Sequence, residues 1–276
     1  MAAGGVESRG MMQETKQIDA VVTTSRKWDN ATLALAQTTA ARLGIPYAER
    51  RTLSLAELRA RYGVTHILVA KNGLLMLETP GGELFFHPNM AHLRIKNIRH
   101  GQGDRMGEAM QLRAGMRVLD CTLGFGADAI TAAYLVGETG QVTGLESQPL
   151  VEAVVGWGLA HFVADSQHVL TAMRRVQTVC TDALTYLRTQ PDRAYDVVYF
   201  DPMFRHPFYA SKALDPLRTV ADPRPLTAET VAEACRVARQ RVVLKETAKS
   251  GEFARLGFTQ VTGGKYSKVH YGVLEL

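Results

Sequence analysis

Residues 118–128 read VLDCTLGFGAD and pass from an apolar run, through an acid, into a turn with two glycines. The next residues, 129–136, carry the apolar spacing of a helix. We therefore predict a strand, a glycine turn and a helix in that order. Glycine lets a ligand approach the backbone closely, and a helix N-terminus offers free N–H groups with a partial positive charge. Gly124, Gly126 and the start of this helix are therefore expected to hold an anionic group of a cofactor.

Strands and helices alternate along the chain beyond this turn, with spacing that fits right-handed crossovers between parallel strands. The chain end departs from the alternation, because two short apolar runs, 257–261 and 268–274, flank Gly263 and Gly264 without room for a full helix. The other predicted strands are 117–121, 141–146, 176–180, 195–200 and 241–245. We therefore predict an α/β fold with a mostly parallel seven-stranded sheet closed by an antiparallel hairpin. That arrangement resembles the Rossmann-like fold of class I S-adenosylmethionine methyltransferases rather than a nicotinamide-binding domain.

The chain before this domain contains a second, smaller pattern of strands and helices. Ser54 and Glu57 have the spacing of a capping box that opens a helix. Two glycine-containing turns separate strand-like runs, which predicts hairpins. We divide the chain into a disordered tail (1–16), a small N-terminal α/β unit (17–88), a basic connecting segment (89–114) and an S-adenosylmethionine-binding methyltransferase domain (115–276).

Composition narrows the class of protein. The chain has 276 residues, of which 46% are hydrophobic and 21% charged, and it has no apolar run of about 18 residues that would cross a membrane. Its three cysteines are scattered, which favours neither a metal site nor a disulfide framework and fits the reducing cytoplasm. A net charge of +5 suits a polyanionic partner, although many proteins that bind no nucleic acid have the same excess.

The glycine turn by itself also fits the loose dinucleotide fingerprint, with alanine in the third place. Asp128 favours S-adenosylmethionine, because a carboxylate there repels a pyrophosphate, whereas Asp120 and Asp128 can lie near the cationic aminomethionine group. Glu146 ends the next predicted strand, where a carboxylate binds the ribose hydroxyls of either cofactor. Asp182 follows the third strand and can accept a hydrogen bond from the adenine amino group, cap the next helix, or do both.

The residues after the strand at 195–200 point to the chemistry. Asp201-Pro202-Met203-Phe204 is similar to the Asp/Asn-Pro-Pro-Tyr/Phe motif of methyltransferases that modify exocyclic amino groups of bases. A carboxylate and a backbone carbonyl that accept both N–H bonds orient such a nitrogen for attack. We assign these bonds to Asp201 and Pro202, and base stacking to Phe204. A proline-terminated strand with a core phenylalanine is the alternative.

A specific family resemblance follows from several stretches together. The chain resembles the bacterial 16S ribosomal RNA guanine-N2 methyltransferases of the RsmJ type, over roughly residues 85 to 276. The resemblance is carried by residues 89–94, 103–109, 119–129, 145–151, 200–204 and 241–245. It implies that S-adenosyl-L-methionine is contacted by Ala127, Asp128, Glu146, Ser147, Asp182, Ala183 and Asp201. Two positions depart from the family pattern, since a basic residue is usual at 127 and an arginine at 147.

Basic residues crowd the segment before the domain. A flexible basic segment can hold RNA phosphates while a base is turned into the pocket; a solvated linker is the alternative. His206 and Lys212 follow the Asp-Pro motif, where they can reach the target base or lie on a loop surface. The candidate RNA contacts are His92, Arg94, Lys96, Arg99, Arg105, His206 and Lys212.

The leading hypothesis is therefore an enzyme that methylates a guanine amino group in ribosomal RNA, free or in the small ribosomal subunit. No metal and no membrane are expected to take part. Three alternatives remain open at this point. They are a methyltransferase for another RNA base or a small molecule, a nicotinamide-dependent oxidoreductase, and a non-catalytic RNA-binding or assembly protein on the same fold.

Overall fold

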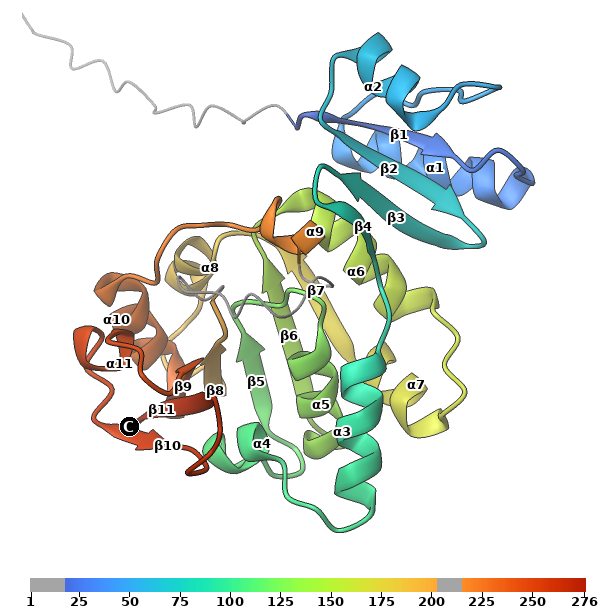
Figure 1. Cartoon of the computed structure of the whole chain (residues 1–276). Coiled ribbons are helices and arrows are strands. Elements are labelled where there is room, and N and C mark those ends of the chain that lie inside the picture. Colours follow the sequence, from blue (N-terminus) through green and yellow to red (C-terminus); the bar gives the residue numbers. More distant parts are fainter. Residues whose placement is uncertain (1–17, 203–214) are drawn as a thin grey trace, which may run out of the picture.

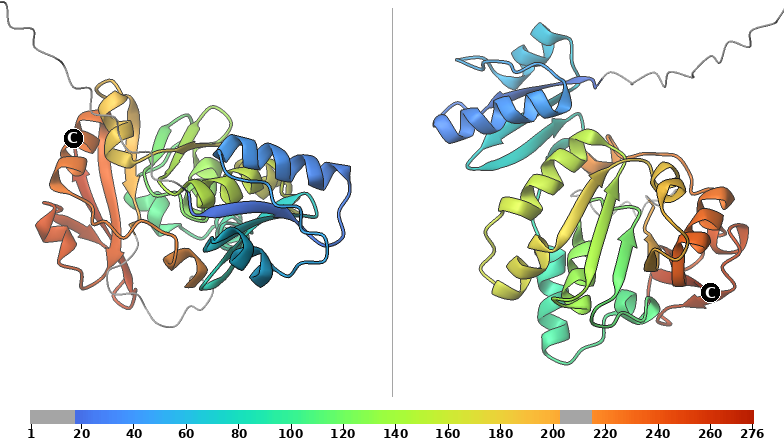
Figure 2. Two further views of the ribbon diagram at one scale, coloured as in Figure 1. Left: turned by 90° about the horizontal axis from the view of Figure 1, so that it is seen from above. Right: turned by 180° about the vertical axis from the view of Figure 1, so that it is seen from behind.

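A computed structural model of the chain describes residues 18–202 and 215–276 (Figure 1). These residues form two sheets, one of four strands and one of seven. Figure 2 shows the part with the smaller sheet as a separate lobe beside the larger part. No helix in the described ranges is long and apolar enough to span a bilayer.

The small lobe contains the N-terminal sheet and two helices. Its strands lie in the order β1 (Ala20–Thr24), β2 (His66–Lys71), β3 (Leu74–Thr79) and β4 (Gly82–Phe85), and the helices are α1 (Asn30–Leu43) and α2 (Leu55–Tyr62). β1 pairs with β2 in parallel and the other pairs are antiparallel. The predicted capping box is confirmed, because the Ser54 side chain accepts from the Glu57 N–H while the Glu57 carboxylate accepts from the Ser54 N–H.

The seven-stranded sheet has the predicted mixed topology. Its strands are β5 (Arg117–Asp120), β6 (Gln141–Glu146), β7 (Val176–Cys180), β8 (Tyr195–Phe200), β9 (Ala238–Thr247), β10 (Gln260–Thr262) and β11 (Val269–Glu275). Their order is β10-β11-β9-β8-β5-β6-β7. The strands from β5 to β9 are mutually parallel, whereas β11 is antiparallel to both β9 and β10. The doubly wound sheet closed by an antiparallel hairpin is thus confirmed.

Helices cover both faces of this sheet (Figures 1 and 2). They are α5 (Ala127–Val136), α6 (Pro149–His161), α7 (Gln167–Arg174), α8 (Ala183–Thr189), α10 (Ala228–Val237) and α11 (Glu252–Arg255). The short helix α9 (Asp215–Arg218) packs instead beside β4 of the small lobe. Alternate strand residues face opposite layers: Val118 and Tyr199 pack in the core with α5, α6 and α7, whereas Leu119 and Phe200 pack in the core with α8 and α10. We call these the α5 face and the α8 face.

The segment 89–114 differs from the prediction. It is not a flexible linker, because it contains two helices, α3 (Asn89–Arg99) and α4 (Arg105–Ala109). Ala91 and Ile95 of α3 are buried, and α3 packs on α5. Of the basic residues that suggested a solvated segment, His92, Lys96 and Arg99 lie on the exposed side of α3, whereas Arg94 is half-buried.

The small lobe is attached to the large one through α6. Phe86, which follows β4, is 2% exposed and lies directly over Gly158 of α6. A Cβ atom at position 158 would come within 2.2 Å of the Phe86 ring, so only glycine fits this contact without a shift. The Trp157 indole also donates a hydrogen bond of 2.8 Å to the Gly73 carbonyl in the turn between β2 and β3.

Candidate active site

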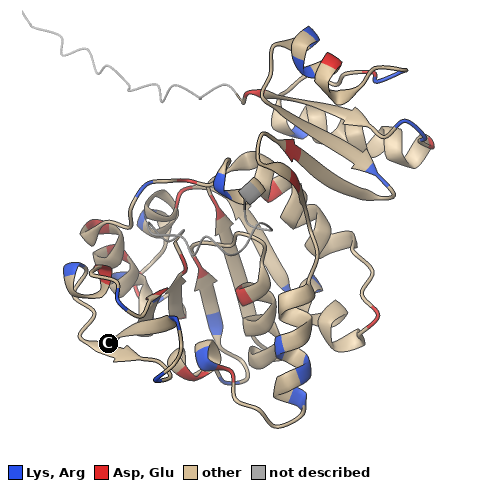
Figure 3. Cartoon of the chain, viewed as in Figure 1, with Lys and Arg blue, Asp and Glu red and all other residues tan. Residues whose placement is uncertain are grey.

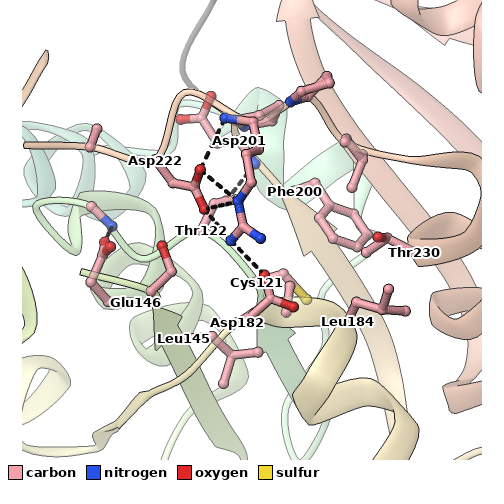
Figure 4. A pocket seen from close by; sticks show the side chains of 18 of the residues that line it. Cys121, Thr122, Leu145, Glu146, Asp182, Leu184, Phe200, Asp201, Asp222 and Thr230 are labelled. Carbon is pink, nitrogen blue, oxygen red and sulfur yellow. Dashed lines mark hydrogen bonds and ion pairs between the residues drawn. The ribbon is translucent and has the colours of Figure 1, made fainter. Parts of the chain in front are cut away.

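A cavity of about 240 Å³ opens at the carboxyl ends of β5, β6 and β8 (Figure 4). Parallel sheets bind ligands at this edge. Residues of α8, α10 and the loop before α10 line much of the cavity, so it lies on the α8 face. Seven of the predicted site residues line it: Gly124, Glu146, Ser147, Asp182, Ala183, Asp201 and Pro202.

Glu146 joins the end of β6 to the glycine turn. Its Oε2 accepts a hydrogen bond from the Gly124 N–H at 3.3 Å and its Oε1 accepts one from the Gln148 N–H at 2.9 Å. Gly124 and Gly126 have φ values of +50° and +76°, which only glycine adopts easily. Burial raises the pKa of Glu146 to about 7. The carboxylate is therefore fixed against the turn and retains lone pairs for hydroxyl donors.

Asp182 has the helix-capping role foreseen for it. Its Oδ1 accepts from the Thr185 N–H at 3.1 Å at the start of α8, while its Oδ2 accepts from the Arg224 guanidinium at 2.9 Å. Arg224 also binds Asp222, and both residues line the cavity. Figure 4 shows Asp182 and Asp222 joined through these bonds across the cavity. An adenine amino group that binds Asp182 would therefore share this carboxylate with Arg224.

Asp201 links the cavity to a cluster of charges on the α5 face. Its N–H donates to Thr122 Oγ1 at 2.6 Å, and its Oδ2 accepts from Lys245 Nζ at 2.6 Å. Lys245 Nζ also donates to Asp128 Oδ2 at 2.9 Å. Burial raises the pKa of Asp201 to about 6, although the Lys245 ammonium acts in the opposite direction.

Asp128 is held entirely by protein groups. It accepts bonds from the Tyr199 hydroxyl at 2.7 Å, from Lys245 and from Arg94. Although burial opposes it, the pKa of Asp128 stays well below its usual range because Lys245 and Arg94 are cationic. Asp128 does not line the cavity, and neither do Gly126, Ala127 and Asp120, which were predicted with it.

Asp120 lies one residue before the cavity wall. Its Oδ1 accepts from the Thr122 N–H at 3.0 Å, whereas its buried Oδ2 has no hydrogen-bond partner among the described residues. Burial raises the pKa of Asp120 to about 7. A buried oxygen without a donor fits a carboxylate that completes its bonding with a cationic ligand group.

The predicted RNA contacts separate in space. Arg94 forms a two-pronged ion pair with Asp104, at 2.8 and 2.9 Å, in addition to its bond to Asp128, and is thus committed to the protein interior. His92, Lys96 and Arg99 line a different depression, between α3 and α7. Arg105 lies near the turn between β10 and β11. Phe204, His206 and Lys212 lie outside the described residues, so their roles stay predictions.

Several site residues were not foreseen. Thr122 lies inside the glycine-turn motif. Its role was not foreseen, because its hydroxyl accepts a hydrogen bond from the N–H of Asp201, which is far away in the sequence. Lys245 could have been noticed as the one cation that follows the apolar run of residues 242–244. Asp222 and Arg224 lie in a loop without a recognisable motif. Within the described ranges, no group of three or more His, Cys, Asp or Glu side chains could hold a metal ion.

Comparison with known proteins shows which family the chain belongs to. The family model "Putative SAM-dependent methyltransferase" matches residues 52–267. The uncharacterized protein YpiP of Bacillus subtilis (strain 168) is 37% identical over 255 residues, which cover 92% of this chain and 99% of YpiP.

Two relatives carry a more specific name. "Ribosomal RNA small subunit methyltransferase J" of Cronobacter sakazakii is 31% identical over 70% of this chain and 82% of its own length. The protein of that name from Stutzerimonas stutzeri is 30% identical over 63% of this chain and 64% of its own length. A crystal structure of a SAM-dependent methyltransferase from Neisseria gonorrhoeae shares the fold, with a TM-score of 0.62, 17% identity and coverage of 92% of this chain and 95% of that one. The chain therefore belongs to the S-adenosylmethionine-dependent methyltransferase family, and its cofactor is S-adenosyl-L-methionine.

Proposed function

We propose that this methyltransferase transfers a methyl group to the exocyclic N2 amino group of a guanine in small-subunit ribosomal RNA. The observation that carries the proposal is the position of Asp201. It lines the cofactor cavity on the α8 face and is also bound to Lys245 on the α5 face. An acceptor that approaches from the α5 side would meet the carboxylate and the cofactor's methyl group together. The printed names of the relatives from Cronobacter and Stutzerimonas support ribosomal RNA as the substrate.

The residues at the cavity fit S-adenosylmethionine. Glu146 would accept hydrogen bonds from the ribose hydroxyls, because its carboxylate is anchored by Gly124 and Gln148 at the end of β6. Asp182 would accept from the adenine amino group at the other side of the cavity. Asp120 lies one residue before the cavity wall, and its buried oxygen without a partner would take the ammonium of the methionine part. Bound in this way, the cofactor supplies an electrophilic methyl group.

Asp201 and Pro202 would then orient the acceptor. The Asp201 carboxylate and the Pro202 carbonyl accept the two N–H bonds of the base amino group, which directs the nitrogen lone pair at the methyl carbon. The bound cofactor would supply the methyl group to this nitrogen, which Asp201 and Pro202 would hold in line for the transfer. The methylated nitrogen carries a positive charge and loses one proton to Asp201 or to water. Because the pKa of Asp201 is about 6, the carboxylate is mostly ionised at pH 7.5 and can accept this proton.

The acceptor is identified by nucleoside analysis. The purified protein is incubated with methyl-labelled S-adenosylmethionine and either small-subunit ribosomal RNA, intact small subunits or a small-molecule extract, and the labelled products are digested to nucleosides. We expect the label in N2-methylguanosine. Label in another base would overturn the guanine assignment, and label only in small molecules would overturn the RNA assignment.

A further inference from the structure

The turn between β10 and β11 lies at the same edge of the sheet as Asp201. In the antiparallel pairing of β11 with β9, Tyr271 is opposite Lys245 and Val269 is opposite Thr247. The Ala248 N–H donates to the Lys268 carbonyl at 3.0 Å, which fixes the end of the turn against the end of β9. Thr247 is two residues beyond Lys245, or about 7 Å along an extended strand. The turn therefore ends about 7 Å along the strand direction from Lys245, whose ammonium binds Asp201.

Exposed cations surround this turn. Figure 3 shows blue segments both at the turn and at the start of α4. Arg105, Lys249, Lys265 and Lys268 are all exposed. Among the residues that the structure describes, the first three form no ion pair, in contrast with the fully paired Arg94. Glu108 is the one acid among the described residues that line the depression beside Arg105. Arg105, Lys249 and Lys265 are therefore available to an anionic partner.

An exposed aromatic ring lies among the cations. Tyr266 is 90% exposed, more than any other large hydrophobic residue that the structure describes. The Lys265 ammonium lies 5.6 Å from the centre of its ring. A cation beside one face leaves the other face open to a planar group. Aromatic rings among cations are characteristic of single-stranded nucleic acid sites, where bases stack and phosphates bind the cations.

Two glycines of the turn allow neighbouring side chains to pack closely against its backbone. A Cβ atom at Gly264 would lie 2.6 Å from Arg105 Nη2, and one at Gly263 would lie 2.1 Å from the His270 ring. The Arg105 guanidinium lies directly against Gly264, where no side chain stands between it and the backbone of the turn. A depression of about 400 Å³ lies between Arg105, Glu108 and Ala109 on one side and Thr262, Gly263, Gly264 and Tyr271 on the other.

We propose that Arg105, Lys249, Lys265 and Tyr266, here called the hairpin patch, bind single-stranded RNA next to the target base. The Tyr266 ring stacks on one nucleotide, and the cations hold the phosphates on either side. This proposal rests on the proposed function, since it names the surface by which the same site would hold its RNA. An acidic peptide satisfies the cations but leaves the ring of Tyr266 without a planar partner, so RNA accounts for both features.

The test uses the full-length protein and a fluorescein-labelled, single-stranded oligoribonucleotide of mixed sequence. Binding is measured by fluorescence anisotropy over a series of salt concentrations. The variants are Tyr266→Ala, Tyr266→Phe and the double variant Lys249→Gln/Lys265→Gln. Matched controls in the small lobe are Tyr62→Ala and Lys71→Gln, which remove an exposed ring and an exposed cation far from the patch. Binding of S-adenosylhomocysteine and transfer of labelled methyl to ribosomal RNA are measured for every variant.

We expect Tyr266→Ala to weaken oligonucleotide binding about tenfold, as loss of one stacked base does, while Tyr266→Phe stays within about twofold. The double lysine variant should reduce the slope of log K against log salt by about 1.4, because each lost contact to single-stranded RNA contributes about 0.7. Binding of S-adenosylhomocysteine should not change in any variant, and both controls should behave as the wild type.

Unchanged RNA binding in all patch variants would overturn the hairpin patch. The proposed function would remain intact in that case, provided that the wild type still methylates RNA. Competition by poly-glutamate as effective as that by RNA would show a general polyanion surface and also overturn the hairpin patch. Methyl transfer to small molecules alone would instead remove the proposed function. In that case a loss of RNA binding confined to the patch variants would still support the patch.

Discussion

Lys245 is the residue on which the charges of the site converge. Its ammonium lies 2.6 Å from Asp201 and 2.9 Å from Asp128, and Asp128 in turn binds Arg94 and the Tyr199 hydroxyl. Two buried carboxylates this close would repel each other without the cation between them. In our proposal Lys245 is therefore a positioning residue, because it would act on the acceptor only through Asp201.

Replacing this cation should change the pH dependence of turnover. In our account Asp201 acts in its ionised form, so turnover falls as the pH drops through its pKa, which is about 6 in the wild type. In Lys245→Met the pKa of Asp201 should rise by about one to three units, since an opposite charge at this distance lowers a carboxyl pKa by that amount. The acidic limb of the kcat profile should shift upward accordingly, and Lys245→Arg should keep it near the wild-type position. An acidic limb that Lys245→Met leaves in place would show that Lys245 only supports the fold.

Cofactor binding should depend on pH through two other carboxylates. Burial raises the pKa of Glu146 and of Asp120 to about 7, and both must be ionised to accept bonds from the cofactor. The affinity for S-adenosylhomocysteine should therefore fall as the pH is lowered from 8 to 6, by about tenfold for each carboxylate. Calorimetric titration should show a weaker pH dependence in Glu146→Gln and in Asp120→Asn. A wild-type affinity that is constant over this range would contradict these assignments.

At the scale of single elements, α3 shows how one helix carries two kinds of cation. Arg94 points inward and ties α3 to the start of α5 through Asp128 and to the start of α4 through Asp104. Arg99, on the same helix, is exposed and lines the depression toward α7. The two arginines contribute equally to the basic composition of the segment. Of the two, only Arg94 forms ion pairs with the half-buried Asp104 and Asp128.

This difference predicts unequal effects on stability. Arg94→Met leaves the half-buried Asp104 and Asp128 without their shared cation, so the free energy of unfolding should fall by about 2 kcal/mol, which is less than for a fully buried pair because Lys245 still binds Asp128. Arg99→Met, the matched control, should change it by less than about 0.5 kcal/mol. Urea denaturation at pH 7.5 measures both values. Equal effects of the two substitutions would refute the structural role of Arg94.

How far the sequence predicts an element depends on how local its signals are. The capping box at Ser54 and the apolar run that forms β8 lie within a few residues, and both were predicted correctly. β9 begins at Ala238 rather than at the predicted residue 241, because Arg239 and Gln240 give it no apolar start and its pairing with Tyr195 of β8 supplies the structure instead. The helical residues 89–99 were misread for a similar reason, since their charge suggested solvent while their packing on α5 was invisible in the sequence.

At the scale of the whole molecule, the fold was largely predictable and the site only in part. Glu146, Asp182 and Asp201 were predicted because a strand end at the carboxyl edge of a parallel sheet marks a ligand site whatever its neighbours are. The partners of Asp201 were not predicted, since Lys245 lies 44 residues away from it in the sequence and 117 residues away from Asp128. Contacts of this range exist only after the sheet has assembled.

In our proposal the molecule as a whole separates the two reactants. The cofactor cavity lies on the α8 face, whereas the charge cluster and the hairpin patch are reached from the α5 face, and Asp201 lies where they meet. In the described part of the chain, the small lobe contacts α6 and the region of α9 but contributes no residue to the lining of the cavity. In our proposal all the residues that take part in the chemistry therefore belong to the large lobe.

The most direct test compares the wild type with Asp201→Ala in one preparation, by calorimetric titration with S-adenosylhomocysteine and by transfer of labelled methyl to small-subunit ribosomal RNA. The account predicts labelled RNA with the wild type. In Asp201→Ala it predicts cofactor affinity within a few-fold of wild type and a turnover lower by about two orders of magnitude, the effect of losing one positioned polar group. Undiminished turnover in Asp201→Ala, or cofactor affinity that falls as much as turnover does, would contradict a catalytic role for Asp201.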